Sequence, residues 1–450
     1  MTMSPPMTSL RAQLTEVGRR LSPIAATPWF RLVVASLLVI CHLIAFSRAG
    51  ESRLGLPFNA APGHAPYYSE PDVSTMRGYP RQPHYWSRML VSRWDAQHYI
   101  GFAVRGLTSC PTDGATAVDM DYLDCGLNWF ATFGKAGGIV ADTTGIPADA
   151  ALLLLAILAA LILNLLWTSK PITDRIGQLE AYATLLAFNL FPSAFYIVTP
   201  YTEGATLALV IAGFVCLLRE RWMLSALLVG AATALRLTAG GFGVALGCAL
   251  LYAAWERHRD GKADWKKPLY AIPLVMWGLV VYVIVLKLSV GDGFAFFRAQ
   301  AAFAEAQGDG GWAFGRLFDG EFYLRGFTAQ HLDSIVVVGT FAIIALTGRE
   351  VWRRFGRTAG IFLVVAAVLL ACAPLAIDRF QYWGLNRYFL LLPLTFFCAG
   401  VMARKHTAVY VLWLLLCAAL YWHVELCSYI SQGHPGVCPC MGRLEFTMPY

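Results

Sequence analysis

Apolar runs of membrane-spanning length recur along the chain and constrain its fold more than any other feature. Clear examples are residues 150–167, 269–288 and 360–377, because a helix of about 20 apolar residues crosses the roughly 30 Å core of a bilayer. Hydrophobic residues make up 57% of the sequence and charged residues only 14%, a balance that excludes an ordinary soluble domain. The sequence therefore predicts an all-α polytopic membrane protein.

Short basic loops predict how the helices cross the membrane, because Lys and Arg gather on the cytoplasmic side. The net charge of +7 is interpreted in this way and not as affinity for nucleic acid. We expect about eleven crossings, with the amino terminus inside and the carboxyl terminus outside. The basic loops are 11–31, 170–175, 219–221, 257–267, 349–357 and 404–405. The predicted spans are 30–48, 150–167, 180–198, 204–218, 269–288, 334–347, 359–377, 387–402 and 408–425, with two more in 223–254.

Residues 223–254 form a stretch that is too long for one straight span and short for two. The middle of this stretch holds Arg236, followed by the pair Gly240 and Gly241. Two short helices that meet near Arg236 would keep the basic loops at both ends on the cytoplasmic side. The sequence therefore predicts a break in the helix at this arginine.

The predicted topology divides the chain into three parts. A cytoplasmic segment (1–29) precedes a transmembrane domain (30–425), and an extracytoplasmic tail with cysteines (426–450) follows it. Two large loops of the domain, 49–149 and 289–333, are expected on the outer face. The first apolar run follows a polar, basic stretch and lacks a convincing cleavage site, so we expect a retained signal anchor.

The segment 93–99 closes the first large loop and places an acid among aromatic and basic side chains. Asp95 lies beside Arg93, Trp94 and His98. A carboxylate in these surroundings, where lipid meets water, can serve as a general base. The same segment also fits an interfacial anchor of Trp, Tyr and Arg that takes no part in chemistry. The segment alone leaves both interpretations open.

Ionisable residues at or within apolar spans are costly, and by default they indicate functional sites. Four places qualify here: Glu203, Arg236, Asp292, and the pair Arg387 and Tyr388. The predicted topology puts all of them on the outer face of the membrane. Two arginines and several acids that converge there would suit an anionic substrate rich in hydroxyl groups.

Three of these places also have an explanation without a function. Arg387 and Tyr388 fit an interfacial pair whose polar tips reach water. Glu203 fits the first turn of a helix, where an acid favours the helix dipole, and Asp292 fits a turn between glycines. Arg236 is hardest to explain in this way, because apolar residues flank it.

The eleven cysteines include no CxxC pair, which argues against a zinc ribbon. Cys110 and Cys125 share the first large loop, and they can form a disulfide if that loop is exported or remain two free thiols. The tail holds Cys427, Cys438 and Cys440. Their spacing leaves open a disulfide or a metal site.

Several short motifs occur in a fixed order between about residues 90 and 400. They are 93–103 followed by Gly106, 188–196 running into 200–203, 232–236, 291–300, and Arg387-Tyr388 followed by Pro393. The ordered set resembles the PIG-V family of mannosyltransferases, the family of the GPI-anchor second mannosyltransferase and its prokaryotic relatives, which have the multi-spanning GT-C architecture. The chain departs from the family at Gly293, where a proline is usual, and at 128–133, which replaces a stretch rich in Phe and Pro.

The resemblance implies a polyprenyl-phosphate sugar donor, such as dolichol phosphate mannose, and transfer on the outer face with inversion at the anomeric carbon. Asp95 would be the catalytic base, and Arg236, Arg387 and Tyr388 would bind the donor phosphate. The remaining substrate-binding residues would be Arg93, Trp94, His98, Glu203, Asp292 and Gln300. The scheme requires no cofactor and leaves a divalent cation open.

The implied partners are the lipid-linked donor, membrane lipid, and a glycolipid, polysaccharide or protein acceptor, with a partner subunit left open. A composition rich in Ala and Arg favours a bacterial inner membrane over an ER membrane. A secondary transporter is one alternative, although paired broken helices in matching halves are expected there. A ligase or polymerase of lipid-linked polysaccharides is another, although its main loop usually lies late in the chain.

Overall fold

The protein is helical in the part that the structure, a computed structural model, describes: residues 23–54, 95–107, 129–299, 329–376 and 385–426. No strand occurs within these ranges. The helices are α2 (Pro28–Leu54), α5 (Asp95–Arg105), α7 (Thr132–Thr144), α8 (Ala148–Trp167), α9 (Lys170–Ile176), α10 (Gln178–Asn189), α11 (Thr202–Leu218), α12 (Trp222–Ala232), α13 (Ala239–Arg259), α14 (Lys267–Ala271), α15 (Trp277–Val290), α19 (Ala329–Phe355), α20 (Arg357–Ala376), α21 (Leu385–Phe389), α22 (Pro393–Lys405) and α23 (Thr407–Leu420).

Five helices in the described ranges are long and apolar enough to cross a membrane. They are Pro28–Ala49, Ala148–Ile176, Ala239–Arg259, Lys267–Val290 and Ile335–Phe355. Shorter apolar helices accompany them at Thr202–Leu218, Trp222–Ala232, Arg357–Cys372 and Thr407–Leu420. The expected helical membrane protein is confirmed, but five spans fall short of the eleven crossings that the basic loops predict.

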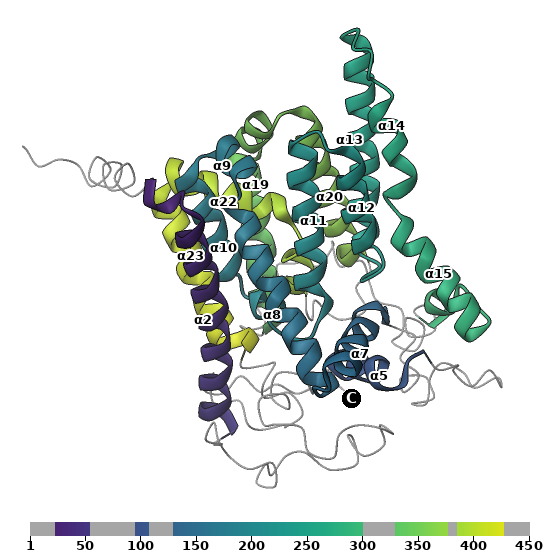
Figure 1. Ribbon diagram of the computed structural model, residues 1–450. Coiled ribbons are helices and arrows are strands. Elements are labelled where there is room, and N and C mark those ends of the chain that lie inside the picture. Colours follow the sequence, from purple (N-terminus) through teal and green to yellow (C-terminus); the bar gives the residue numbers. More distant parts are fainter. Residues whose placement is uncertain (1–22, 55–94, 108–128, 300–328, 377–384, 427–450) are drawn as a thin grey trace, which may run out of the picture.

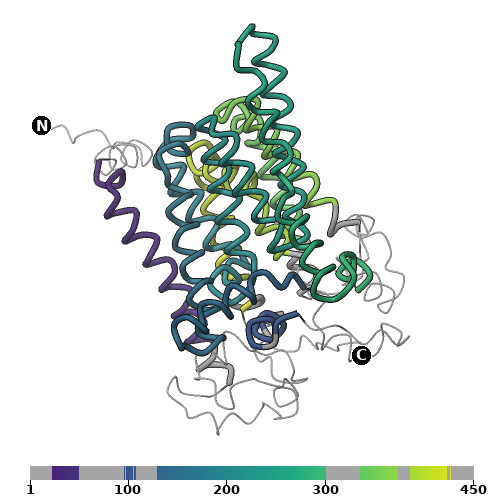
Figure 2. Tube along the Cα trace, turned by 45° about the vertical axis from the view of Figure 1, so that its right-hand side comes forward, coloured from purple at the N-terminus to yellow at the C-terminus, as the bar shows by residue number. Residues whose placement is uncertain are grey.

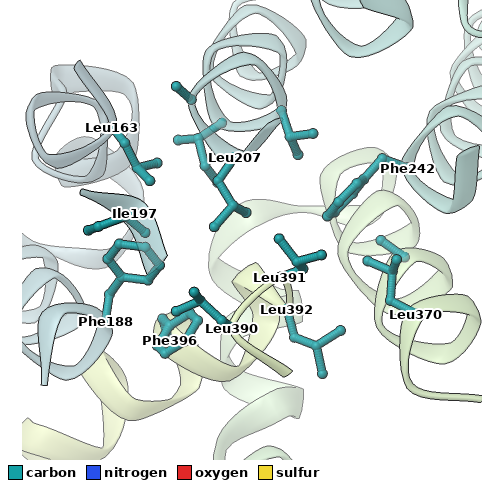
Figure 3. Packing of buried hydrophobic residues seen from close by; sticks show 14 of the residues in the cluster. Leu163, Phe188, Ile197, Leu207, Phe242, Leu370, Leu390, Leu391, Leu392 and Phe396 are labelled. Atoms are coloured by element: carbon teal, nitrogen blue, oxygen red, sulfur yellow. The ribbon is translucent and has the colours of Figure 1, made fainter. Parts of the chain in front are cut away.

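The apolar helices stand side by side in one bundle (Figures 1 and 2). α11 packs between α8 and α12, α10 packs on α22, and α13 packs on α20. Figure 3 shows the centre of the bundle, where Phe188 meets Phe396 and Leu207 lies near Leu391. Because lipid is as apolar as these side chains, close van der Waals packing supplies much of the attraction between helices. Gly400 illustrates this, since an added Cβ would lie 2.1 Å from Thr184 Oγ1 on α10.

The break predicted at Arg236 is confirmed. α12 ends at Ala232 and α13 begins at Ala239, so Arg236 lies in the connecting turns. Thr233 holds the end of α12, because its hydroxyl donates to Gly230 O at 2.6 Å and accepts the Leu279 N–H at 2.9 Å. The connection is therefore tied to α15 and is not a free loop.

Two predicted spans are wrong in the same way, because proline interrupts them. The span 180–198 ends as an α-helix at Asn189, and a turn with a single 3₁₀ segment (Ala194–Ile197) follows it. Pro192 cannot donate a backbone hydrogen bond, which stops the helix. The span 387–402 is divided into α21 and α22, and Pro393 occupies the first turn of α22.

Two further predicted spans carry local irregularities. The span 269–288 bends at a 3₁₀ segment (Ile272–Leu274) that contains Pro273, between α14 and α15. The last span is α-helical only to Leu420, and a π-helical turn follows at Tyr421–Leu426.

Two helices in the predicted first loop pack against the lower end of the bundle in Figure 1. These are α5 and α7, which contact each other, and α7 also packs on α8. Glycines on one face of α7 allow this approach. A Cβ on Gly134 would lie 2.4 Å from Tyr99 O, and a Cβ on Gly138 would lie 2.6 Å from Ala103 O. Neither helix was predicted from the sequence, which placed both in the first large loop.

The opposite end of the bundle gathers the basic loops. Arg31 donates to Leu165 O at the end of α8 (2.7 Å), Arg354 donates to Ile176 O at the end of α9 (2.6 Å), and Arg257 pairs with Glu220 (2.8 Å). Segments that are far apart in sequence thus meet at one end, as the charge pattern predicts. We call this region the basic end.

Candidate functional site

The candidate site is built around a carboxylate in the first turn of α11. Glu203 follows the N-cap residue Tyr201 by two positions, and its side chain is fully buried, with 0% exposed. The helix dipole favours an acid at this position. A buried charge is nevertheless expensive unless cations and hydrogen bonds compensate it. The neighbours of Glu203 supply that compensation.

Two arginines from distant segments meet at one oxygen of this carboxylate. Arg236 Nη1 donates to Glu203 Oε1 at 2.5 Å, and Arg387 Nε donates to the same oxygen. The arginine side chains are 14% and 16% exposed. Thr238 also holds Arg236, because its hydroxyl accepts the Nε hydrogen at 2.9 Å. We call Glu203, Arg236 and Arg387 the arginine cluster.

Tyrosine rings surround the guanidinium groups of the arginine cluster. The guanidinium carbon of Arg387 lies 4.6 Å from the ring centre of Tyr201 and 4.9 Å from that of Tyr196. The guanidinium of Arg236 lies 5.5 Å from the ring of Tyr388. These distances fall within the range of cation–π attraction. The rings fix the arginines while leaving them slightly exposed.

The helix that begins with Asp95 contacts one of the tyrosines that cover Arg387. Tyr99 of α5 contacts Tyr201 edge-on, with ring centres 6.3 Å apart, and it also contacts Phe133 of α7 edge-on at 5.9 Å. Asp95 occupies the first position of α5 and is four residues from Tyr99, so the two positions share one face of the helix. The side chain of Asp95 lies outside the described part of the structure.

The structure brings together four residues that the sequence singled out, namely Glu203, Arg236, Arg387 and Tyr388. Glu203 is buried beneath the two arginines, which suits a residue that positions them. Only the two guanidinium groups and Tyr388 retain partial exposure.

Asp292 instead finds its partners within its own loop. Its carboxylate pairs with the exposed Arg298 and accepts the Phe294 N–H at 3.0 Å. The alternative of a turn residue is therefore favoured for this acid. The remaining predicted residues lie outside the described ranges: Arg93, Trp94, Gln300, Cys110, Cys125, Cys427, Cys438 and Cys440.

Sequence reasoning missed the aromatic residues that shape the site. Tyr196 and Tyr201 lie in the turn between α10 and α11, close to Pro192 and Pro200. The sequence signal that could have identified them is the presence of tyrosines close to prolines in the short connection between two apolar runs. His98, by contrast, was among the residues expected to bind substrate. Its ring stacks on Trp129, with ring centres 3.5 Å apart and planes 14° apart.

The arginine cluster offers hydrogen-bond donors to an anion. A guanidinium has five N–H donors, and the bonds to Glu203 and Thr238 use two nitrogens of Arg236. Arginine matches phosphate oxygens well, because its planar fork can donate two parallel hydrogen bonds. The described residues contain no group of three or more side chains suited to hold a metal ion.

The chain has no match among known protein families, curated proteins or solved structures. Its function must therefore be inferred from the site.

Proposed function

We propose that this membrane protein is a glycosyltransferase of GT-C architecture that moves mannose from a polyprenyl-phosphate donor to a hydroxyl of an extracytoplasmic acceptor. The observation that carries the proposal is the meeting of Arg236 and Arg387 on the buried Glu203, next to the helix that begins with Asp95. The resemblance to the PIG-V family agrees with this assignment.

The donor suits the surroundings of the arginine cluster. Its isoprenoid tail would lie along apolar helix faces while its phosphate reaches Arg236 and Arg387. Their partial exposure supports access for such a group. Charge-assisted hydrogen bonds to phosphate are about twice as strong as neutral ones. The Tyr388 hydroxyl would add a further donor.

The reaction would be a single displacement. Asp95 removes the proton from the acceptor hydroxyl, and the oxygen attacks the anomeric carbon of the sugar. The bond from that carbon to the phosphate oxygen breaks, and the lipid phosphate leaves with the electron pair. The arginines stabilise the negative charge that develops on it. One displacement inverts the anomeric configuration, so a β-linked donor gives an α-linked product.

The proposed orientation places the basic end in the cytoplasm and the arginine cluster on the outer face. The support is the positive-inside rule together with the gathering of Arg31, Arg257 and Arg354 at one end of the bundle. A bacterial inner membrane is the proposed location, and a glycolipid, polysaccharide or protein is the proposed acceptor class.

The test is sugar transfer from radiolabelled polyprenyl-phosphate mannose by the purified full chain in detergent, with a mixed lipid extract as acceptor. Asp95→Asn should lower the transfer rate by about 10²–10⁴ while donor binding stays unchanged. Asp174→Asn is the matched control, because this acid pairs with Lys170 on the surface of the basic end. Normal transfer by the Asp95→Asn variant would contradict the assignment of the base.

A secondary transporter is the second candidate, and the interrupted helices favour it. The helical chain breaks after α10, between α12 and α13, and between α21 and α22, and all three breaks border the arginine cluster. Broken helices of this kind form substrate sites in transporters. Proteoliposomes decide between the candidates: uptake of a labelled phosphorylated sugar, without a glycosylated product, would favour transport.

A further inference from the structure

A buried histidine lies within the first membrane-spanning helix and has hydrogen-bond partners on two other segments. His42 of α2 is only 4% exposed. Its Nδ1 lies 2.7 Å from the Tyr421 hydroxyl, and its Nε2 lies 3.1 Å from Asn189 Oδ1. An ionisable residue buried within a membrane-spanning helix is costly, and by default it indicates a functional role.

The direction of each hydrogen bond in this group follows from the Asn189 amide. Its Nδ2 donates to Leu185 O at 2.8 Å and to Asn164 Oδ1 at 3.1 Å, so its oxygen faces His42. Because a carbonyl oxygen only accepts hydrogen bonds, Nε2 of His42 carries the hydrogen, and Nδ1 of the neutral ring accepts the Tyr421 hydroxyl. Both ring nitrogens are thus used to connect α2 with α10 and with the π-helical turn after α23.

Both partners of His42 lead to the turn between α10 and α11. Asn189 is the last residue of α10, immediately before this turn. Tyr421 contacts Phe195 within the turn, with ring centres 5.9 Å apart. Phe46 follows His42 by four positions and so shares its face of α2, and it also contacts Phe195, at 5.6 Å. One face of α2 therefore holds this turn at its beginning and at its centre.

The same turn supplies tyrosine rings to the arginine cluster. Phe195 stacks on Tyr196, with ring centres 4.4 Å apart. The Tyr196 ring in turn lies 4.9 Å from the guanidinium carbon of Arg387. Because protein interiors are close-packed, a displacement of Phe195 must displace Tyr196. The contacts thus form a continuous path from His42 to the arginine cluster.

Attachment of α2 to the bundle does not by itself explain a buried histidine. At the basic end Arg31 donates to Leu165 O at 2.7 Å and to Thr168 Oγ1 at 3.2 Å. Along the rest of the helix, van der Waals packing can supply the attraction without the cost of burying a polar group. The histidine is therefore explained by the segments that it joins, which hold the turn that covers Arg387.

We propose that His42 is a positioning residue for the donor site, which acts through the turn between α10 and α11 to fix the Tyr196 ring over Arg387. The effect on donor binding rests on the proposed transferase function, whereas the effect on the turn does not. A fixed ring restricts the guanidinium to one orientation, so less conformational entropy is lost when an anion binds. His42 thus acts on donor affinity and not on the chemical step.

The first test follows hydrogen exchange of residues 190–201 by mass spectrometry, in the full chain in detergent. Tyr421→Phe removes one hydrogen bond and keeps the ring, whereas His42→Leu removes both bonds. Exchange of the turn should rise about fivefold in the first variant and at least about tenfold in the second. Arg31→Leu is the matched control, because it removes two hydrogen bonds from the other end of the same helix and should leave the turn unchanged. Circular dichroism establishes that each variant is folded.

Donor kinetics supply a readout that a purely structural role would not produce. With radiolabelled polyprenyl-phosphate mannose, His42→Leu should raise the donor KM about three- to tenfold and leave kcat unchanged, since the ring over the guanidinium is no longer fixed. His42→Gln should recover part of the affinity, because its amide can donate to Asn189 Oδ1 in place of Nε2.

Unchanged exchange of the turn in both His42→Leu and Tyr421→Phe would overturn the inference, as would an equal rise in Arg31→Leu. These outcomes need no donor and are therefore independent of the proposed function. Transfer by wild type with a donor KM unchanged by His42→Leu refutes the positioning role and leaves the transferase intact. Raised exchange of the turn, with neither donor binding nor transfer by wild type, contradicts the transferase and supports the role of His42 in fixing the turn.

Discussion

Each end of the bundle has a buried glutamate that pairs with two arginines. The two ends differ in how far the arginine side chains are exposed to water and in whether a second acid shares them. At the basic end Glu180 pairs with Arg354 at 3.4 Å and with Arg404 at 3.2 Å. Arg404 is 66% exposed and Arg354 is 20% exposed, whereas Arg236 and Arg387 around Glu203 are 14% and 16% exposed.

A second acid shares the cations at the basic end. Glu350 pairs with Arg354 at 2.9 Å, with Arg353 at 2.7 Å and with Lys405 at 3.2 Å. These cations lie in the last turns of α19 and α22, where they also favour the helix dipoles. The positive charges of the basic end thus lie where the helices end, and they are balanced by Glu180 and Glu350 and by exposure to water.

The two arginines of the arginine cluster are held in a different way. They come from a helix break and from the short α21, and tyrosine rings cover them. Two guanidinium groups converge on one carboxylate oxygen in surroundings that screen charge poorly. In this protein, water and a second acid reach the cations of the basic end, whereas the fold confines Arg236 and Arg387 around a single carboxylate oxygen.

The largest expected difference between the two ends is in stability. Glu203→Gln should lower the free energy of unfolding by about 3–5 kcal/mol, because it leaves confined cations without their carboxylate. Glu180→Gln should cost about 1 kcal/mol, because Arg404 can be hydrated and Arg354 keeps Glu350. Denaturation of both variants in detergent measures this. Equal losses would remove the contrast between the ends.

Donor affinity should distinguish the arginines. Arg387→Ala should weaken binding of polyprenyl-phosphate mannose by about ten- to a hundredfold, since a hydrogen bond to a charged group contributes about 1.5–3 kcal/mol. Arg404→Ala at the basic end should leave the affinity unchanged. Equilibrium binding of radiolabelled donor measures both. An unchanged affinity for Arg387→Ala contradicts its role at the phosphate.

Two glycines next to the glutamates give a matched test of packing. A Cβ on Gly400 would lie 2.4 Å from Glu180 O, and a Cβ on Gly204 would lie 2.7 Å from Ile197 O. Each change to Ala should cost about 1–3 kcal/mol through overpacking. Only Gly204→Ala should also weaken donor binding, because it displaces the turn that carries Tyr196. A donor affinity lowered equally by Gly400→Ala would show that the site responds to any loosening of the bundle.

The smallest expected effect is a pH dependence confined to the basic end. Arg257 donates to Asp264 at 2.6 Å and holds the pKa of that carboxyl below its ordinary value. The contribution of Asp264 to stability is therefore present above its unfolded pKa of about 3.9 and is lost as pH falls through the lower folded pKa. The protection factors of residues 257–267, which compare hydrogen exchange with the intrinsic rate at each pH, should fall below about pH 4. The protection factors of the Asp264→Asn variant should not show this fall.

Much of the fold was accessible from the sequence, because lipid requires apolar side chains at nearly every exposed helix position. The runs at 150–167 and 204–218 correspond to α8 and α11. Pro192 and Pro393 were available as signals of a helix break. The prediction nevertheless followed hydropathy alone and treated the segments on either side of each proline as one span. The helices α5 and α7 were missed because their residues are too polar to register as spans.

The sequence by itself determined that this is a helical membrane protein and that Glu203, Arg236 and Arg387 are costly charges in apolar surroundings. Only the tertiary structure decided that they meet. Glu203 is separated from Arg236 by 33 residues and from Arg387 by 184, and no local pattern specifies contacts over such distances. It also decided that Asp292 pairs elsewhere and that Tyr196 and Tyr201 cover Arg387. The apolar residues around each charge determine the free-energy cost of burying it. The packing of helices that are distant in the sequence determines which partner offsets that cost.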